Sequence, residues 1–125
     1  MELLNLFRQS KEVESFSAGQ TIFRTGDAGE TMYVVIDGEV EVSLNGAPLE
    51  TIGPGGILGE LSLVDHSPRS ADALAKSACV VAPVSERRFL FLVQETPYFA
   101  LHVMSVMAER LRQRTHEVAS AQKGP

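Results

Sequence analysis

Residues 31–44 read TMYVVIDGEVEVSL, in which two apolar runs flank the dipeptide Asp37-Gly38. In the second run valine and leucine alternate with polar residues, which is the pattern of a strand with one buried face. Asp-Gly is a favoured two-residue turn between antiparallel strands. We therefore expect residues 31–36 and 39–44 to form a β-hairpin.

Short runs of the same kind extend on both sides of this stretch, from about residue 13 to residue 84, with glycines between them. They are rich in β-branched and aromatic residues, which favour strands. Asn45-Gly46 predicts a second turn that leads into 49–52, and 71–76 and 79–84 are interpreted as closing strands. Several short strands at this spacing predict a mainly β double-stranded roll, or jelly roll.

A helical pattern precedes the strands. Residues 2–10 place Leu3, Leu6 and Phe7 on one face, which predicts a short amphipathic helix that covers the core. With the roll at 13–84, this helix is expected to belong to a single domain of 125 residues.

Two further helices are predicted after the roll, over about residues 86–119. Ser85 is a residue type that caps helices, and Pro97 favours a first helical turn. The second helix repeats apolar residues at intervals of three and four, and these are Ala100, Val103, Met104, Met107 and Leu111. The arginines near its end are interpreted as a solvated face, since cations are favoured near a helix C-terminus.

Composition limits the cellular compartment and the binding partners that we expect for this chain. The chain is 44% hydrophobic and 22% charged, and its net charge of −5 disfavours direct binding to nucleic acid. No apolar run approaches the ~18 residues that span a bilayer, and the N-terminus lacks the basic start of a signal peptide. The single cysteine, Cys79, is expected to be a small buried strand residue. These features predict a cytoplasmic protein in a reducing compartment, with no membrane partner.

The segment 59–71, GELSLVDHSPRSA, has residue types that suit an anion site. Gly59 lets the backbone approach a ligand closely, and a short helix after it would present unsatisfied N–H groups. Arg69 adds a permanent positive charge with a planar donor fork, Ser70 adds a hydroxyl, and Glu60 can accept a hydrogen bond from a sugar. These residues predict a sugar-phosphate pocket. The alternative is that Glu60 and Arg69 pair only with each other across a turn.

This run resembles the phosphate-binding cassette of the cyclic-nucleotide-binding domain family, whose members are β-rolls like that of the catabolite activator protein. The match covers 59–63 and 68–71. Upstream, Gly26-Asp27, Tyr33 and Gly38 are also similar to the family's early strands and turns, so the resemblance extends from about residue 3 to residue 118.

The resemblance implies a role for each matching residue. Arg69 would pair with the cyclic phosphate, and Glu60 would accept the ribose 2′-hydroxyl. Ser70 and backbone groups near Leu61, Ser62 and Ala71 would complete the phosphate cradle beside Gly59. By weaker alignment, Val42, Leu49 and Leu58 would flank the base, although each is equally explained as core of the roll.

Two positions depart from the family pattern. Leu58 stands where an aromatic residue is commoner, which should change packing more than chemistry. Asp72 is expected to share a strand face with Ser70. It would weaken phosphate binding if it pointed toward Arg69, and would be harmless if it pointed outward into solvent. His66 falls in the variable spacer, is expected to be exposed, and is given no metal role.

The resemblance implies a non-catalytic sensor of cyclic AMP or cyclic GMP, with no other cofactor, in which residues 97–118 move when the ligand binds. No helix-turn-helix follows these residues, so the output is expected to pass through self-association or a separate effector protein. One alternative is a protein-interaction module that has lost nucleotide binding, which Asp72 would support. Another is a small cupin-like metalloenzyme, disfavoured because His66, His102 and His116 all lie outside the predicted strands.

Overall fold

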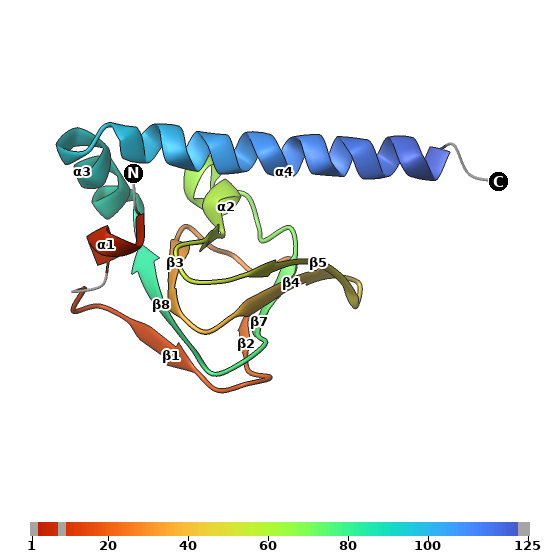
Figure 1. Cartoon of the computed structure of the whole chain (residues 1–125), viewed down its shortest axis with the longest axis horizontal. Helices are drawn as coiled ribbons and strands as arrows, with labels where there is room; N and C mark the ends of the chain where they lie inside the picture. The colour runs from red at the N-terminus through yellow and green to blue at the C-terminus, as the bar shows by residue number, and fades with distance from the viewer. Residues whose placement is uncertain (1–2, 8–9, 123–125) are drawn as a thin grey trace.

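In the computed structural model of the chain, two four-stranded antiparallel sheets form a roll. The helices lie along the upper side of the roll and at one end of it (Figure 1). The structure describes residues 3–7 and 10–122, without the side chains of 117–122. One sheet has the order β1 (Glu14–Phe16), β8 (Cys79–Val84), β3 (Met32–Asp37) and β6 (Ile57–Leu58). The other has the order β2 (Thr21–Phe23), β7 (Asp72–Ala75), β4 (Val40–Leu44) and β5 (Ala47–Ile52). The predicted mainly β roll is confirmed.

The hairpin predicted at Asp37-Gly38 is wrong. Strand β3 pairs with β6 and β8, whereas β4 pairs with β5 and β7, so this turn carries the chain from one sheet to the other. Both strands bury residues in the interior between the two sheets, so both show the alternation of a half-buried strand. This alternation does not distinguish a strand that is hydrogen-bonded in the same sheet from a strand of the facing sheet. Gly38 makes the crossing possible, because its φ is +79° and a side chain at this position would collide with Ala78 and Cys79.

The second predicted turn is a true hairpin. Asn45 and Gly46 have φ values of +53° and +81°, and they join β4 to β5 with Leu44 opposite Ala47. Two consecutive residues with positive φ are the mark of a turn whose twist matches the strands.

The helices fall close to their predicted places. Helix α1 (Leu3–Phe7) buries Leu3 and Phe7 but leaves Leu6 exposed, and residues 2, 8 and 9 of the predicted helix lie outside the described residues. In α3 (Glu86–Glu95) the Ser85 hydroxyl accepts a hydrogen bond from the Arg88 amide at 3.2 Å, which confirms the predicted cap. Helix α4 (Tyr98–Gln122) begins directly after Pro97.

The interior has two apolar clusters. One lies between the sheets and includes Val35, Val40 and Val81; Cys79 belongs to it, as predicted. The other joins the roll to α1, α3 and α4, where the ring of Phe99 lies 6.4 Å from Phe7 and 5.3 Å from Phe89. This second cluster fixes α4 across the top of the roll.

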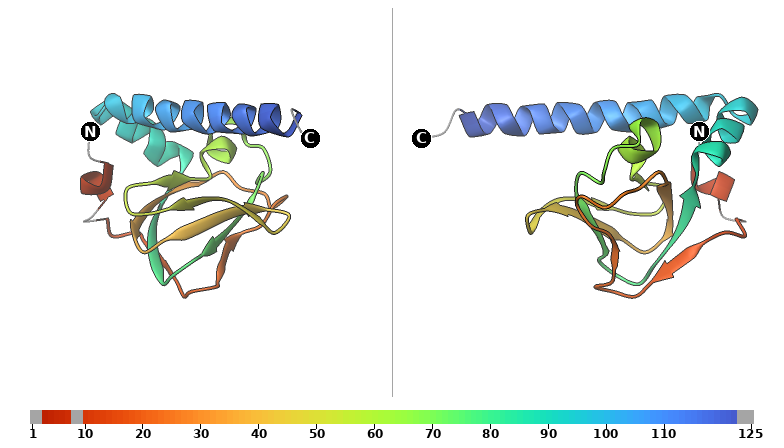
Figure 2. Two further views of the ribbon diagram at one scale, coloured as in Figure 1. Left: turned by 45° about the vertical axis from the view of Figure 1, so that its right-hand side comes forward. Right: turned by 180° about the vertical axis from the view of Figure 1, so that it is seen from behind.

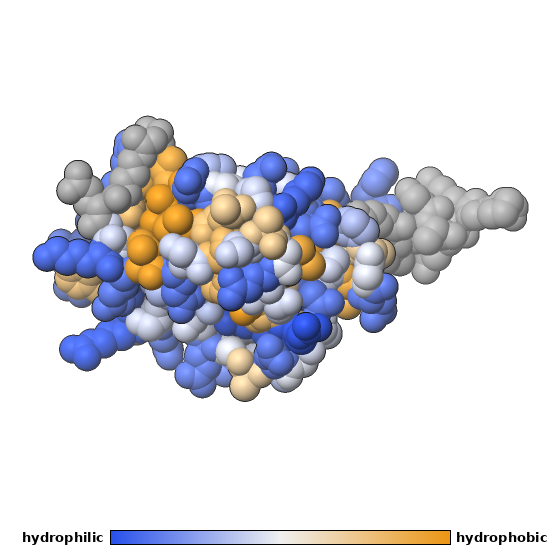
Figure 3. Space-filling model, turned by 90° about the horizontal axis from the view of Figure 1, so that it is seen from below, coloured by the Kyte–Doolittle hydropathy of each residue, from blue (hydrophilic) through white to orange (hydrophobic). Residues whose placement is uncertain are grey.

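Helix α4 runs over the small helix α2 (Glu60–Asp65), and its C-terminal turns project beyond the roll (Figures 1 and 2). Its predicted apolar face divides in two. Val103 is buried against the roll, whereas Met104 and Leu111 are 53% and 69% exposed. Among the described residues, no helix combines the length and apolarity needed to cross a bilayer. The face opposite α4 is largely hydrophilic, with hydrophobic residues gathered toward the end where α1 and α3 lie (Figure 3).

Replacing Gly38 by alanine tests the crossing between the sheets. The new Cβ would press on the carbonyl oxygen of Ala78, a backbone atom, in addition to adopting a strained positive φ. We expect Gly38→Ala to lower the free energy of urea unfolding by about 3 kcal/mol or more. Gly46→Ala is the matched control, because Gly46 has a similar φ but open space around it. It should cost only about 1–2 kcal/mol, and equal losses in the two variants would contradict the crossing role of Gly38.

Candidate functional site

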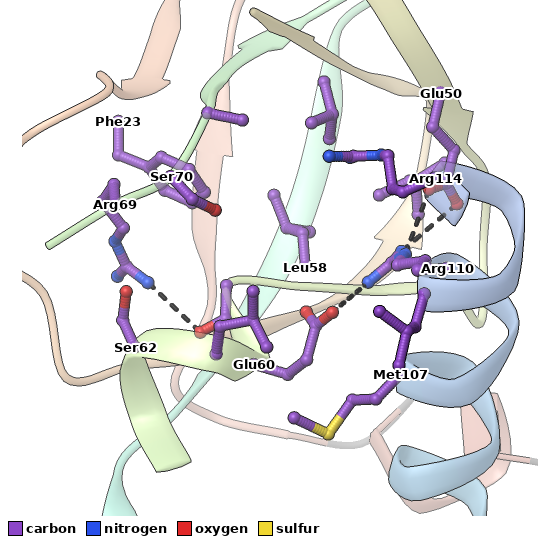
Figure 4. Close-up of a pocket in the computed structure, with 16 residues that line it drawn as sticks. Phe23, Glu50, Leu58, Glu60, Ser62, Arg69, Ser70, Met107, Arg110 and Arg114 are labelled. Atoms are coloured by element: carbon purple, nitrogen blue, oxygen red, sulfur yellow. Dashed lines mark hydrogen bonds and ion pairs between the residues drawn. The ribbon is translucent and has the colours of Figure 1, made fainter. Parts of the chain in front are cut away.

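A cavity of about 400 Å³ lies between α4, the phosphate-binding-cassette segment 59–71 and the sheet that contains β4 and β5 (Figure 4). Its lining residues from the roll and the cassette are Phe23, Val42, Glu50, Ile52, Leu58, Gly59, Glu60, Leu61, Ser62, Arg69, Ser70 and Ala71; those from α4 are Met107, Arg110, Leu111 and Arg114. The cavity therefore joins charged groups at the cassette to apolar groups on the sheet.

The cassette folds as expected around Gly59. This residue has a φ of +78° and precedes α2, while His66 in the left-handed conformation ends α2. A side chain at position 59 would meet Arg69 Nη1 at 2.7 Å and the Thr31 carbonyl oxygen at 3.1 Å. Glycine is therefore needed both for the turn and for the approach of Arg69.

Arg69 is buried, with 5% of its surface exposed. Its Nη1 donates to the carbonyl oxygen of Gly59 at 3.2 Å, and its Nη2 donates to that of Thr31 at 2.8 Å. The guanidinium also lies over the ring of Phe23, 4.3 Å from the centroid. Burial lowers the pKa of Arg69, but an arginine stays charged at neutral pH. Within the described part of the chain no carboxylate lies within ion-pair distance of it, although the charges of Asp27 and Glu60 favour its charged form from further away.

Glu60 is equally buried but has a different partner. Its carboxylate accepts a hydrogen bond from Arg110 of α4, and both side chains point into the cavity (Figure 4). Glu60 and Arg69 therefore line one cavity without pairing with each other, contrary to the alternative in which they only bridge a turn.

Arg110 connects α4 to three points of the roll. Besides Glu60, it donates to both carboxylate oxygens of Glu50, at 3.0 and 3.2 Å, and to the carbonyl oxygen of Ile57 at 2.6 Å. Burial alone would lower the pKa of Arg110, but the two carboxylates outweigh it and raise the pKa above its ordinary value. The interpretation of this arginine as part of a solvated face is wrong, because its side chain is 19% exposed and lies in the ion-pair cluster.

Most of the predicted site residues meet at the cavity, and Leu49 does not. Val42 and Leu58 line it with all the predicted cassette residues, whereas from β5 the lining residues are Glu50 and Ile52. Alternation along β5 explains the difference, because residues 50 and 52 share a face that Leu49 does not. Val42 lies opposite Glu50 in the sheet register, which brings both to the same wall.

Sequence reasoning missed Phe23, Glu50, Ile52 and the four residues of α4. A signal existed for the last group, since 107, 110, 111 and 114 follow the three- and four-residue spacing of one helix face. Nothing in the sequence shows that this face lies over the cassette rather than in solvent.

Asp72 is hydrogen-bonded to Thr25 and is not among the residues that line the cavity beside Arg69. Its Oδ1 accepts hydrogen bonds from the amide of Thr25 at 2.7 Å and from the Thr25 hydroxyl at 2.9 Å, which lower its pKa. Asp72 does not line the cavity. The sequence argument that its carboxylate would repel a phosphate, which supported the interaction-module alternative, is therefore not supported by its position. His66 is exposed as predicted, near Glu30 and Glu86.

This β-roll holds a cavity with a buried cation that has no direct ion-pair partner among the described residues, a buried carboxylate and an apolar wall, and such a combination is typical of proteins with a small-molecule pocket. Comparison with known proteins makes the class specific. The profile of the family described as "Cyclic nucleotide-binding domain" matches residues 13–96. The chain therefore belongs to the cyclic nucleotide-binding domain family.

Individual relatives agree with this family. The "Cyclic AMP receptor protein" of Thermus thermophilus is 32% identical over 108 residues, which are 82% of this chain and 50% of that protein. The "cAMP-dependent protein kinase regulatory subunit" of Eremothecium gossypii is 42% identical over 72 residues, 58% of this chain and 16% of that protein. The crystal structure of Thermus thermophilus Catabolite Activator Protein superposes with a TM-score of 0.79 at 29% identity, covering 89% of this chain and 55% of that one. The chain thus spans about half the length of its receptor relative.

Removal of the Arg110 side chain tests the ion-pair cluster. Arg110→Ala would leave the buried Glu60 carboxylate without its partner, so we expect it to lower the free energy of urea unfolding by about 3 kcal/mol. Arg112→Ala, an exposed arginine on the same helix, should change it by no more than about 0.5 kcal/mol. A small, equal effect of both substitutions would show that Arg110 does not hold α4 to the roll.

Proposed function

We propose that the cavity binds a cyclic nucleotide monophosphate and that the chain, as a single non-catalytic domain, acts as a sensor of this ligand. The observation that carries the proposal is Arg69, a buried guanidinium with no carboxylate partner among the described residues. A buried charge is costly unless it is paired, so an anion that enters the cavity would gain more here than at an exposed arginine.

The two ends of the cavity suit the two ends of such a ligand. The cyclic phosphate would lie against Arg69, Ser70 and the first amides of α2, which have no partners within the helix. Glu60 would accept the ribose 2′-hydroxyl. The base would pack on the apolar wall that includes Val42 and Leu58. The family relationship and the meeting of these residues at one cavity both support this assignment.

Helix α4 is the proposed output element. Arg110 donates to the same Glu60 carboxylate that the ribose would contact, so binding changes the hydrogen bonds that hold α4 to the roll. A ligand that interacts differently with two positions of a helix shifts the balance between them. The proposed signal is therefore a change in how α4 lies on the cassette.

Substitution of Arg69 by glutamine tests the phosphate assignment. The change removes the charge but keeps hydrogen-bond donors for the carbonyls of Gly59 and Thr31, which alanine would leave unpaired. We expect Arg69→Gln to weaken binding of cyclic AMP and cyclic GMP by at least about 30-fold in titration calorimetry, as for loss of one member of a buried charge pair. Arg24→Gln, at an exposed position outside the cavity, should leave affinity unchanged.

A thermal-shift measurement separates the sensor from an interaction module that has lost its ligand. Nucleotide at 100 times its dissociation constant should add about 2.7 kcal/mol to the stability of the wild-type protein. No shift with either nucleotide up to millimolar concentration would exclude the sensor and favour the interaction module.

The exposed face of α4 suits a partner, either a second copy or a separate effector. Leu101, Met104 and Leu111 are 57%, 53% and 69% exposed and are separated by three and seven residues, so they form one apolar stripe, which reaches the edge of the cavity at Leu111. We propose self-association through this stripe. The proposed partners exclude nucleic acid, given the net charge of −5.

Light scattering tests this contact. We expect wild-type protein at micromolar concentration to have twice the mass of the chain, and Leu101→Asp/Met104→Asp to have the mass of one chain. Arg112→Asp controls for added negative charge on α4. A monomeric wild-type protein at all concentrations would point instead to an effector of another kind.

A further inference from the structure

We infer that Arg114 makes the cavity prefer guanine over adenine, so that the ligand is cyclic GMP rather than cyclic AMP. This inference rests on the proposed function, since it assigns the base to the cavity described above. Arg114 is one of the arginines that the sequence pattern assigned to a solvated face, and it lines the cavity.

Arg114 lies at the end of the cavity away from Arg69, where the proposed ligand would place its base. It follows Arg110 by four residues and therefore occupies the same face of α4, about one helical turn (~5.4 Å) further along. Its side chain points from α4 across the cavity toward the sheet, beyond Leu58 (Figure 4). The phosphate end, marked by Arg69 and Ser70, lies at the opposite side of the same view.

Arg114 is available to a ligand, in contrast to Arg110. Each of the three guanidinium nitrogens of Arg110 already donates, to Glu50, Glu60 or the carbonyl oxygen of Ile57. Arg114 makes no hydrogen bond or ion pair with any residue that the structure describes, and it is exposed at the cavity mouth.

At this end of the cavity, the polar groups free to bind a ligand are the hydrogen-bond donors of Arg114. An arginine has five N–H donors and no acceptor. Glu50, which lines the cavity from the sheet side, already receives hydrogen bonds from Arg110 on both carboxylate oxygens. Val42, Ile52 and Leu58, which line the same cavity, are apolar.

A donor fork distinguishes the two purines. Guanine presents two adjacent acceptors, N7 and O6, which an arginine can bind together. Adenine presents N7 beside an amino group, so the second N–H of the fork would face another donor. One bidentate contact of this kind corresponds to a preference of about tenfold or more.

Calorimetric titration of the full chain with three cyclic nucleotides tests the inference. Cyclic GMP should bind the wild-type protein at least about tenfold more tightly than cyclic AMP. Cyclic IMP keeps N7 and O6 but lacks the 2-amino group, so it should bind like cyclic GMP. Arg114→Ala should weaken cyclic GMP and cyclic IMP about tenfold and cyclic AMP less than about threefold, removing the preference.

Two variants separate hydrogen bonding from charge. Arg114→Lys keeps the positive charge but loses the fork, and should also lose the preference. Arg112→Ala removes a charge from a neighbouring position of α4 that does not line the cavity, and should leave all three affinities unchanged. Urea unfolding of each variant checks that the fold is intact.

Each outcome decides between the two proposals. Equal or tighter binding of cyclic AMP by the wild-type protein, or an equal loss for all nucleotides in Arg114→Ala, would overturn the role of Arg114 and leave the sensor function intact. Failure of the wild-type protein to bind any of the three nucleotides would overturn the proposed function and the base preference with it.

Discussion

The side chain of Arg69 joins three parts of the molecule that are distant in the sequence. Its guanidinium donates hydrogen bonds to the carbonyl oxygens of Thr31 and Gly59 and packs on the ring of Phe23, so that β2, the end of β6 and the loop before β3 all meet around one side chain. Glycine at position 59 is required because any side chain there would contact Arg69. The shape of the cassette therefore depends on a cation whose charge the described residues leave without a carboxylate partner, and the same feature that organises the site attracts an anion to it.

A second arginine, Arg110, connects the cavity to helix α4. Arg110 binds one carboxylate from β5 and one from α2, and it is the only charged group of the described part of α4 found in an ion pair with the roll. The apolar contacts of Phe99 and Val103 hold the start of α4, and partly buried Val106 and Met107 continue this packing up to the turn at which Arg110 adds its polar contacts. A helix that is anchored by apolar packing at one end and by ion pairs over the cavity can respond to the contents of the cavity without loss of the fold.

The sequence allowed most of the fold and the cassette to be predicted, because strand alternation, turn residues and capping residues are local signals. The wrong hairpin at Asp37-Gly38 shows the limit of such signals: alternation reports that a strand has a buried face but not which strand it pairs with. The same limit applies to the site. Arg69 and Glu60 belong to one local motif, whereas Arg110 and Glu50 are 60 residues apart and meet only after α4 crosses the roll.

The order of the strands also has a consequence for synthesis of the chain. Strand β7 lies between β2 and β4, and β8 lies between β1 and β3, so the last two strands of the roll occupy interior positions in their sheets. A ribosome-bound chain that ends before residue 72 lacks both of these strands, and β1 and β2 then have no neighbour to pair with. The pairs β3–β6 and β4–β5 can form earlier, but β1 and β2 stay unpaired until residues 72–84 leave the exit tunnel. Closure of the roll is thus a late, long-range event rather than stepwise growth from the N-terminus.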